Sequence, residues 1–203
     1  ELDHMAELTE GMLAKVRSVL ESRDLGELSQ QHDRIVVLRE AVLNYLQHVG
    51  RSEFSDAEAD EHARLVAATG EIENMSAAVS YELIPLAQTL KEANTTPSKE
   101  TTDLLERLFQ TIQASAHSAL RALVEHDEQA AQTVIASRDA ILELTSQFHR
   151  QQAVRLAGNE PDRLLKLRVQ LEILDRLRRL YSVAEHMAIS VLPRSVLAGE
   201  LSA

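Results

Sequence analysis

The chain has 203 residues and a formal net charge of −11, with 3% aromatic residues, six glycines, four prolines and no cysteine. Binding to a phosphate backbone requires a basic surface, so this charge argues against a nucleic-acid binder. The lack of cysteine excludes disulfides and thiolate zinc sites, and no run of about 18 apolar residues is present to span a membrane. Few helix breakers and abundant Leu and Ala predict an all-α protein with long helices.

The acidic charge is concentrated in the first half of the chain. Residues 1–94 carry 18 Asp and Glu against 8 Lys and Arg, a net charge of −10, whereas residues 95–203 carry 14 against 13. Two interpretations stay open: an acidic face that meets a basic partner, and an acidic surface that keeps the protein in solution.

Apolar residues at helical spacing predict six amphipathic helices, three in each half of the chain. The first is expected over residues 2–22, and its apolar stripe begins without a cap at Leu2, which suggests a fragment of a longer protein. A break is expected at residues 24–26, after which the second stripe runs to Gly50.

The third helix has the clearest pattern, with apolar residues at steps of three and four from Leu65 to Leu90. Ser55 and Glu58 precede this stripe in the order of a capping box, so the helix is expected to begin there. Pro85 interrupts the stripe without ending it, which predicts a kink rather than a helix end.

Residues 94–98 read Asn-Thr-Thr-Pro-Ser and predict the linker between the halves. Pro97 and Pro161 are each expected to start a helix, the fourth and the sixth. The fifth helix is expected after Asp127, with its apolar stripe continuing to Phe148.

The two halves resemble each other at an offset of about 106 residues. Asp33, Ile35, Leu38 and Val42 then correspond to Asp139, Ile141, Leu144 and Phe148. We therefore predict an elongated antiparallel helix bundle made of two three-helix repeats, residues 1–94 and 95–203, packed together as one domain.

Enzyme signatures are absent from the sequence: it contains no GxGxxG, GxxxxGK[ST] or GxSxG, and its glycines are scattered singly. The eight histidines form no HExxH and no repeated metal spacing. His32-Asp33 and His126-Asp127 are interpreted as helix caps and solvated surface. We predict that the protein is not an enzyme and has no catalytic, cofactor-binding or metal-ligating residue.

Glu73 is the carboxylate that we consider as a candidate metal ligand, because helical bundles can hold metals with inward carboxylates on facing helices. One turn later, where a second carboxylate would be needed, the chain has Ala77, and the corresponding positions of the sixth helix are Arg178 and Ser182. An arginine in such a place repels a cation, so the pattern disfavours a metal.

A basic stretch occupies residues 163–179 and contains Arg163, Lys166, Arg168, Arg176, Arg178 and Arg179. It could bind phosphate or an acidic partner, since guanidinium forks match both. The alternative, which we favour, is intrahelical ion pairing of Glu172 with Arg176 and of Asp175 with Arg178 and Arg179.

The third and sixth helices resemble those of PhoU-like domains, phosphate-uptake regulators built from two three-helix repeats. Stand-alone members carry a stretch close to L-E-R-I-G-D-H-A in each third helix, whose Glu and Asp bind metal clusters. Here residues 72–77 read Ile-Glu-Asn-Met-Ser-Ala and residues 177–182 read Leu-Arg-Arg-Leu-Tyr-Ser, so only Glu73 keeps its carboxylate. Residues 176–182 are similar to the stretch D-L-K-R-I-N-S-H-I of PhoU-like domains fused behind bacterial sodium/phosphate symporters.

This resemblance, which covers nearly the whole chain, implies a regulatory domain of a sodium/phosphate symporter on the cytoplasmic side of the inner membrane. Such a domain would associate with the membrane only through its parent protein. It would modulate phosphate transport by contact with the transmembrane part or with a signalling protein, with a homodimer as an option. Two alternatives stay open: a stand-alone, metal-binding PhoU regulator, and a helical sensor or adaptor bundle unrelated to phosphate.

Overall fold

The computed structural model describes residues 1–22, 26–50, 54–83, 85, 89, 98–156 and 163–193. These residues form helices and no strands, as the composition predicts. The helices are α1 (Leu2–Ser22), α2 (Gly26–Val49), α3 (Asp56–Ala78), the π-helical turn η1 (Val79–Leu83), α5 (Lys99–Glu125), α6 (Glu128–Ala136), α7 (Arg138–Leu156) and α8 (Arg163–Val191). Within the described ranges, no helix has both the length and the apolarity that a bilayer span needs.

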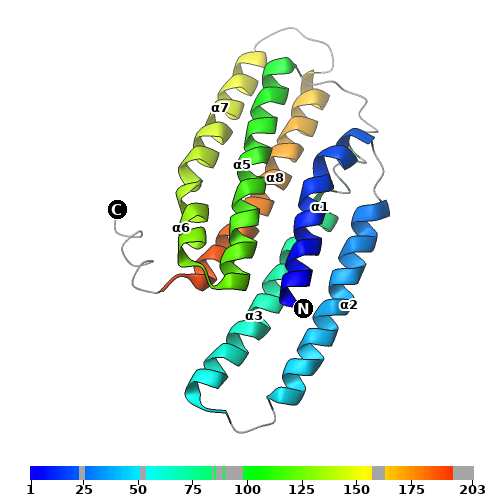
Figure 1. Cartoon of the computed structure of the whole chain (residues 1–203). Helices are drawn as coiled ribbons and strands as arrows, with labels where there is room; N and C mark the ends of the chain where they lie inside the picture. Colours follow the sequence, from blue (N-terminus) through cyan, green and yellow to red (C-terminus); the bar gives the residue numbers. More distant parts are fainter. Residues whose placement is uncertain are drawn as a thin grey trace.

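The helices pack as two groups that lie side by side (Figure 1). One group contains α1, α2, α3 and η1, the other contains α5 to α8, and successive long helices run in opposite directions. The groups meet where α1 packs against α5 and where α3 packs against α8. A single cluster of buried apolar residues extends through both groups, so they share one core. Whether the groups are sequence repeats stays a prediction.

Small residues let the two central helices of the second group approach closely. The contact between α5 and α8 is the most extensive one between helices. α5 buries Ala116 and Ala119, and α8 buries Ala184 and Ala188. Alanine side chains are short, so helices that carry them can pack close together. A core poor in aromatic residues can then still be filled without voids.

The expected fifth helix is interrupted by one residue, a break that the sequence analysis did not predict. α6 ends at Ala136 and α7 begins at Arg138. Between them, Ser137 donates its hydroxyl to the Val134 carbonyl at 2.7 Å, and its Oγ lies 2.8 Å from the Ser115 Oγ on α5. A serine hydroxyl that bonds to the backbone competes with the regular helical ladder. The apolar stripe continues through this break, so periodicity could not reveal it.

Two predicted helix boundaries are confirmed. At α3, Ser55 Oγ accepts from the Glu58 amide at 3.4 Å and Glu58 Oε2 accepts from the Ser55 amide at 2.9 Å, which is the expected capping box. α2 ends at Val49, beside the expected Gly50. The hydrogen bonds from Ser55 lower the pKa of Glu58, because they favour the charged carboxylate.

The interpretation of His126-Asp127 as caps is also confirmed. His126 ends α5 in the left-handed conformation at φ 54°, and Asp127 starts α6 by accepting from the amides of Gln129 at 2.9 Å and Ala130 at 3.0 Å. The Ala130 hydrogen bond is the main reason that the pKa of Asp127 is lowered.

Proline positions agree only partly with the sequence prediction. Pro97, Pro161 and most of the expected linker lie outside the described residues, and the adjoining helices begin at Lys99 and Arg163. Before Pro85, the chain forms the π-helical turn η1. Pro85 is itself helical but has no amide hydrogen for the carbonyl of Tyr81, and a wider turn is a common way to accommodate such a defect.

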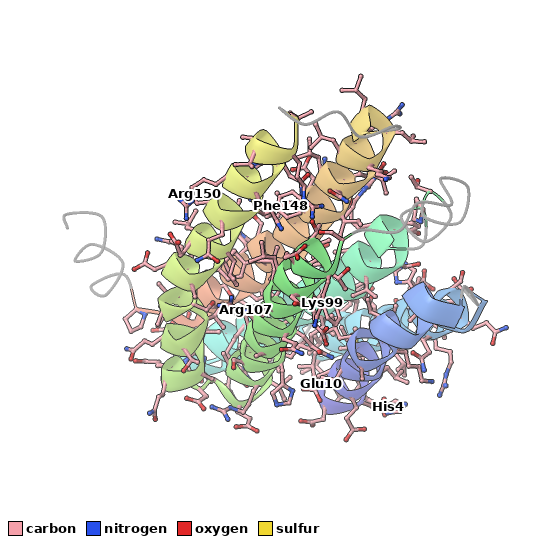
Figure 2. The ribbon with its side chains drawn as sticks, turned by 90° about the horizontal axis from the view of Figure 1, so that it is seen from above. His4, Glu10, Lys99, Arg107, Phe148 and Arg150 are labelled. Carbon is pink, nitrogen blue, oxygen red and sulfur yellow. The ribbon has the colours of Figure 1, made fainter. Side chains whose placement is uncertain are left out.

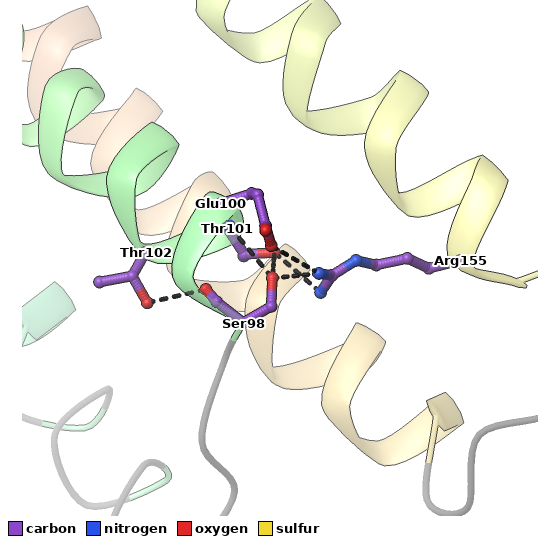
Figure 3. A network of polar contacts seen from close by, with 5 residues as sticks. All are labelled: Ser98, Glu100, Thr101, Thr102 and Arg155. Atoms are coloured by element: carbon purple, nitrogen blue, oxygen red, sulfur yellow. Dashed lines mark hydrogen bonds and ion pairs between the residues drawn. The ribbon is translucent and has the colours of Figure 1, made fainter.

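The start of α5 is tied to the end of α7 by Arg155 (Figure 3). Ser98 caps α5 by accepting from the Thr101 amide at 3.3 Å. The Arg155 guanidinium donates to the Ser98 hydroxyl, to Thr101 Oγ1 at 3.1 Å and to Glu100 at 3.3 Å. One cation therefore fixes the first turn of α5 against the last turn of α7.

Replacement of Phe148 by alanine should destabilise the fold strongly. Figure 2 shows Phe148 pointing from α7 into the second group, and the side chain is fully buried. We expect the free energy of unfolding in urea to fall by about 3–5 kcal/mol. Val154→Ala, at an exposed position of the same helix, should change it by less than about 0.5 kcal/mol. Equal losses in both variants would show that Phe148 is not in the core.

Ser98→Ala removes a helix cap and one partner of Arg155. The loss should lower the free energy of unfolding by about 1–2 kcal/mol, because orphan amides of α5 lose their acceptor. Ser146→Ala, an exposed serine within α7, is the matched control and should leave stability nearly unchanged. Chemical denaturation of both variants checks this, and a Ser98 variant as stable as the control would contradict the network.

Candidate functional site

Open grooves run along α8, and one of them lies on each side of Arg179 and Ser182. The α3–α8 groove is lined on one side by Glu71, Asn74 and Glu82, and on the other by Arg179, Ser182 and His186. The α7–α8 groove is lined by Arg138, Leu142, Asp175, Arg178, Tyr181 and Glu185, and again by Arg179 and Ser182. Arg179 and Ser182 thus form a ridge between two charged grooves.

Two glutamates of the first group reach across the α3–α8 groove to α8. Glu82 accepts hydrogen bonds from Arg176 and, at 3.3 Å, from Arg179. Glu71 lies 3.3 Å from Nδ1 of His186. Both carboxylates are only 17% exposed, whereas Arg179 and His186 are largely exposed. A sheltered carboxylate needs a cation nearby, and for Glu82 the arginines of α8 supply it.

Arg176 is the most sheltered cation of this junction. It binds Glu82 across the groove and lies 3.5 Å from Glu172 of its own helix. The hydrogen bond to Glu82 raises the pKa of the guanidinium further, so the charge is permanent. The predicted pair of Glu172 with Arg176 is confirmed.

The other two predicted intrahelical pairs are wrong. In the described part of the chain, Asp175 forms no ion pair with Arg178 or Arg179. Arg179 pairs with Glu82 on η1 instead. Spacing along α8 suggested the pairs, but a sheltered carboxylate on the neighbouring element attracts Arg179 more strongly than an exposed one on the same helix.

The structure does not bring together the residues of the compared metal-binding stretches. Glu73 faces α2, where its carboxylate lies 3.8 Å from Nε of Arg39. Arg178 lines the α7–α8 groove, and Ser182 lies on the ridge of α8. Across the described ranges, no group of three or more His, Cys, Asp or Glu side chains is arranged to hold a metal.

His32 is buried, which corrects its interpretation as a cap or solvated residue. It is 4% exposed, and its Nδ1 lies 3.0 Å from Oγ of Ser76 on α3. The Ser76 hydroxyl donates to the Glu73 carbonyl at 2.8 Å, so its oxygen accepts from His32 and Nδ1 carries the hydrogen. Leu28, His32 and Ile35 share one face of α2, a spacing that could have revealed the burial.

Two hydrogen-bonded side chains line the α7–α8 groove. Arg138 donates from Nε to Glu185 at 2.8 Å, and the Tyr181 hydroxyl lies 3.1 Å from the Val134 carbonyl and 3.3 Å from Glu185. Burial raises the pKa of Tyr181, so its hydroxyl stays neutral. These contacts fix α6, α7 and α8 relative to one another.

Polar contacts also join α1 and α5, the other pair of helices that pack between the groups. Nδ1 of His117 on α5 lies 2.8 Å from the carboxylate of Glu10 on α1, and Gln113 donates to the Leu13 carbonyl at 3.3 Å. Glu10 is labelled on α1 in Figure 2. Polar contacts therefore accompany apolar packing at both junctions.

Comparison of the chain with known protein families, with curated proteins and with solved structures finds no match.

The pair of Glu82 and Arg176 should contribute measurably to stability. A double-mutant cycle with Glu82→Gln and Arg176→Met is expected to give a coupling energy of about 1 kcal/mol, since both groups are sheltered. The matched cycle on Glu143 and Arg150, an exposed pair on α7, should give a coupling close to zero. Urea denaturation provides the energies, and equal coupling in both cycles would contradict a special role of this junction.

Proposed function

We propose that the chain is a regulatory domain that acts by contact with a partner protein rather than by chemistry. In its most specific form, it is a PhoU-like domain of a sodium/phosphate symporter on the cytoplasmic side of the membrane, where it modulates phosphate transport. The partner is the transmembrane part of the transporter or a signalling protein.

The junction of α3 and η1 with α8 carries this proposal. The helices compared with the metal-binding helices of stand-alone regulators are linked here by Glu82, which binds Arg176 and Arg179. Glu73, the one carboxylate kept from the compared stretches, faces Arg39 instead. These residues suit a bundle that transmits a contact between its helices better than one that assembles a metal cluster.

Burial at two of the four corresponding pairs supports the repeat on which the resemblance depends. Ile35 and Ile141 are both buried, and Asp33 and Asp139 are both exposed, whereas Leu38 and Val42 are half-buried and their counterparts Leu144 and Phe148 are buried. α3 and α8 also begin at an offset close to the one that relates these residues. The acidic first group and the arginines of α8 give the domain surfaces of different charge for partners.

Measurement of sodium-dependent phosphate uptake tests the proposal. In the full-length transporter, deletion of these residues should change the rate of uptake or its response to external phosphate. Glu82→Gln should do the same more weakly, because it loosens the α3–α8 junction, whereas the exposed Glu143→Gln should not. Membrane abundance of each variant is measured as the control. Unchanged uptake and unchanged regulation after deletion would overturn the proposal.

Two other results would favour the alternative functions. Iron or zinc at near-stoichiometric levels in protein purified without chelator would favour a stand-alone, metal-binding regulator. A full-length protein with one or two hydrophobic spans, rather than two sets with internal repetition, would favour a receptor or sensor.

A further inference from the structure

We propose that the α7–α8 groove binds a small oxyanion of the phosphate type through Arg178, Arg179 and Ser182. The proposal stands on the groove itself and does not depend on the regulatory function proposed above. The groove has a volume of about 470 Å³, enough for a phosphate group together with a small organic substituent.

The arginines of the groove differ in how far they are engaged. Arg138 is held by Glu185 at 2.8 Å. Arg179 donates a hydrogen bond from Nη1 to Glu82 across the ridge, and the other N–H groups of its guanidinium can still bind an anion. Within the described residues, Arg178 forms no ion pair or hydrogen bond. The guanidinium of Arg178 is therefore the first binding group for an anion.

The spacing along α8 places the donors together. Ser182 follows Arg178 by four residues and Arg179 by three, and side chains at these spacings are neighbours on a helix surface. Two guanidinium forks and a hydroxyl offer more donors than one carboxylate can accept, and they match a tetrahedral anion with three or more free oxygens. Asp175, one turn before Arg178 and Arg179, repels an anion, whereas the charge of Glu185, one turn after Ser182, is compensated by Arg138 at 2.8 Å.

The α7 side of the groove explains why an organic substituent fits there. Leu142 is half-exposed and Ile141 lies beside it in the lining, so the α7 wall is apolar next to the charged Arg138. The neighbouring Tyr181 hydroxyl is already engaged by Val134 and Glu185. A ligand with an anionic end at Arg178 and a small apolar portion at Leu142 would meet complementary groups at both ends.

Isothermal titration calorimetry at low salt, with inorganic phosphate and pyrophosphate as probes, tests the proposal. Binding is expected at concentrations below about 10 mM. Arg178→Ala should weaken it about tenfold or more, since one charged hydrogen bond contributes on that scale. Arg150→Ala, an exposed arginine on the outer side of α7, is the control and should leave the affinity unchanged (Figure 2).

A second variant tests the ridge directly. Glu82→Gln removes the carboxylate that competes with phosphate for Arg179, so it should raise the affinity for phosphate a few-fold. The exposed Glu143→Gln should not change this affinity. Helical circular dichroism confirms that each variant is folded. No binding by the wild type, or equal binding by the Arg178 and Arg150 variants, would overturn the proposal. Binding of a poly-glutamate peptide without binding of phosphate would also overturn it, in favour of an acidic protein partner.

Discussion

The sheltered carboxylate of Glu82 sets a condition that the packing of the whole chain must meet. Glu82 belongs to the first helical group, and its partners Arg176 and Arg179 belong to the second. A carboxylate withdrawn from water is costly unless cations and donors compensate it. Neither group satisfies this charge alone, so the ion pairs favour the docked arrangement over separated groups.

Helix register determines which carboxylates take part in this junction. Glu71, Ala78 and Glu82 follow one another at spacings of seven and four, so they share the face of α3 and η1 that looks towards α8. Glu73 lies two residues further than Glu71, on a different side of the helix, and meets Arg39 of α2. Comparison of the sequence with the metal-binding stretch therefore selects Glu73, the carboxylate that faces α2 and not α8.

Much of the fold could be predicted from local signals. Apolar spacing gave the long helices, and Ser55 with Glu58 gave the start of α3, because a capping box is encoded within four residues. The break at Ser137 could not be predicted, since it depends on hydroxyl contacts with Val134 and with Ser115 of another helix.

The candidate site was harder to predict from the sequence, because it too depends on contacts between residues far apart in the chain. The partners of Arg179 and Asp175 were predicted from spacing on one helix, but the actual partner of Arg179 lies 97 residues away. The burial of His32 likewise depends on Ser76 of a neighbouring helix. Contacts between helices depend on how the helices pack against one another. Apolar periodicity predicts which face of a helix is packed, but it does not predict which side chains pair across the contact.

The ridge of α8 gives the two grooves two residues in common, Arg179 and Ser182. Arg179 lines both, and its present partner Glu82 lies on the side of α3 and η1. An anion or acidic group in the α7–α8 groove competes with Glu82 for this arginine, while Arg176 continues to hold Glu82. If the proposed anion binds on one side of α8, it therefore changes the free energy of the contact on the other. By linkage, any partner that shifts the α3–α8 junction changes the affinity of the α7–α8 groove by the same factor.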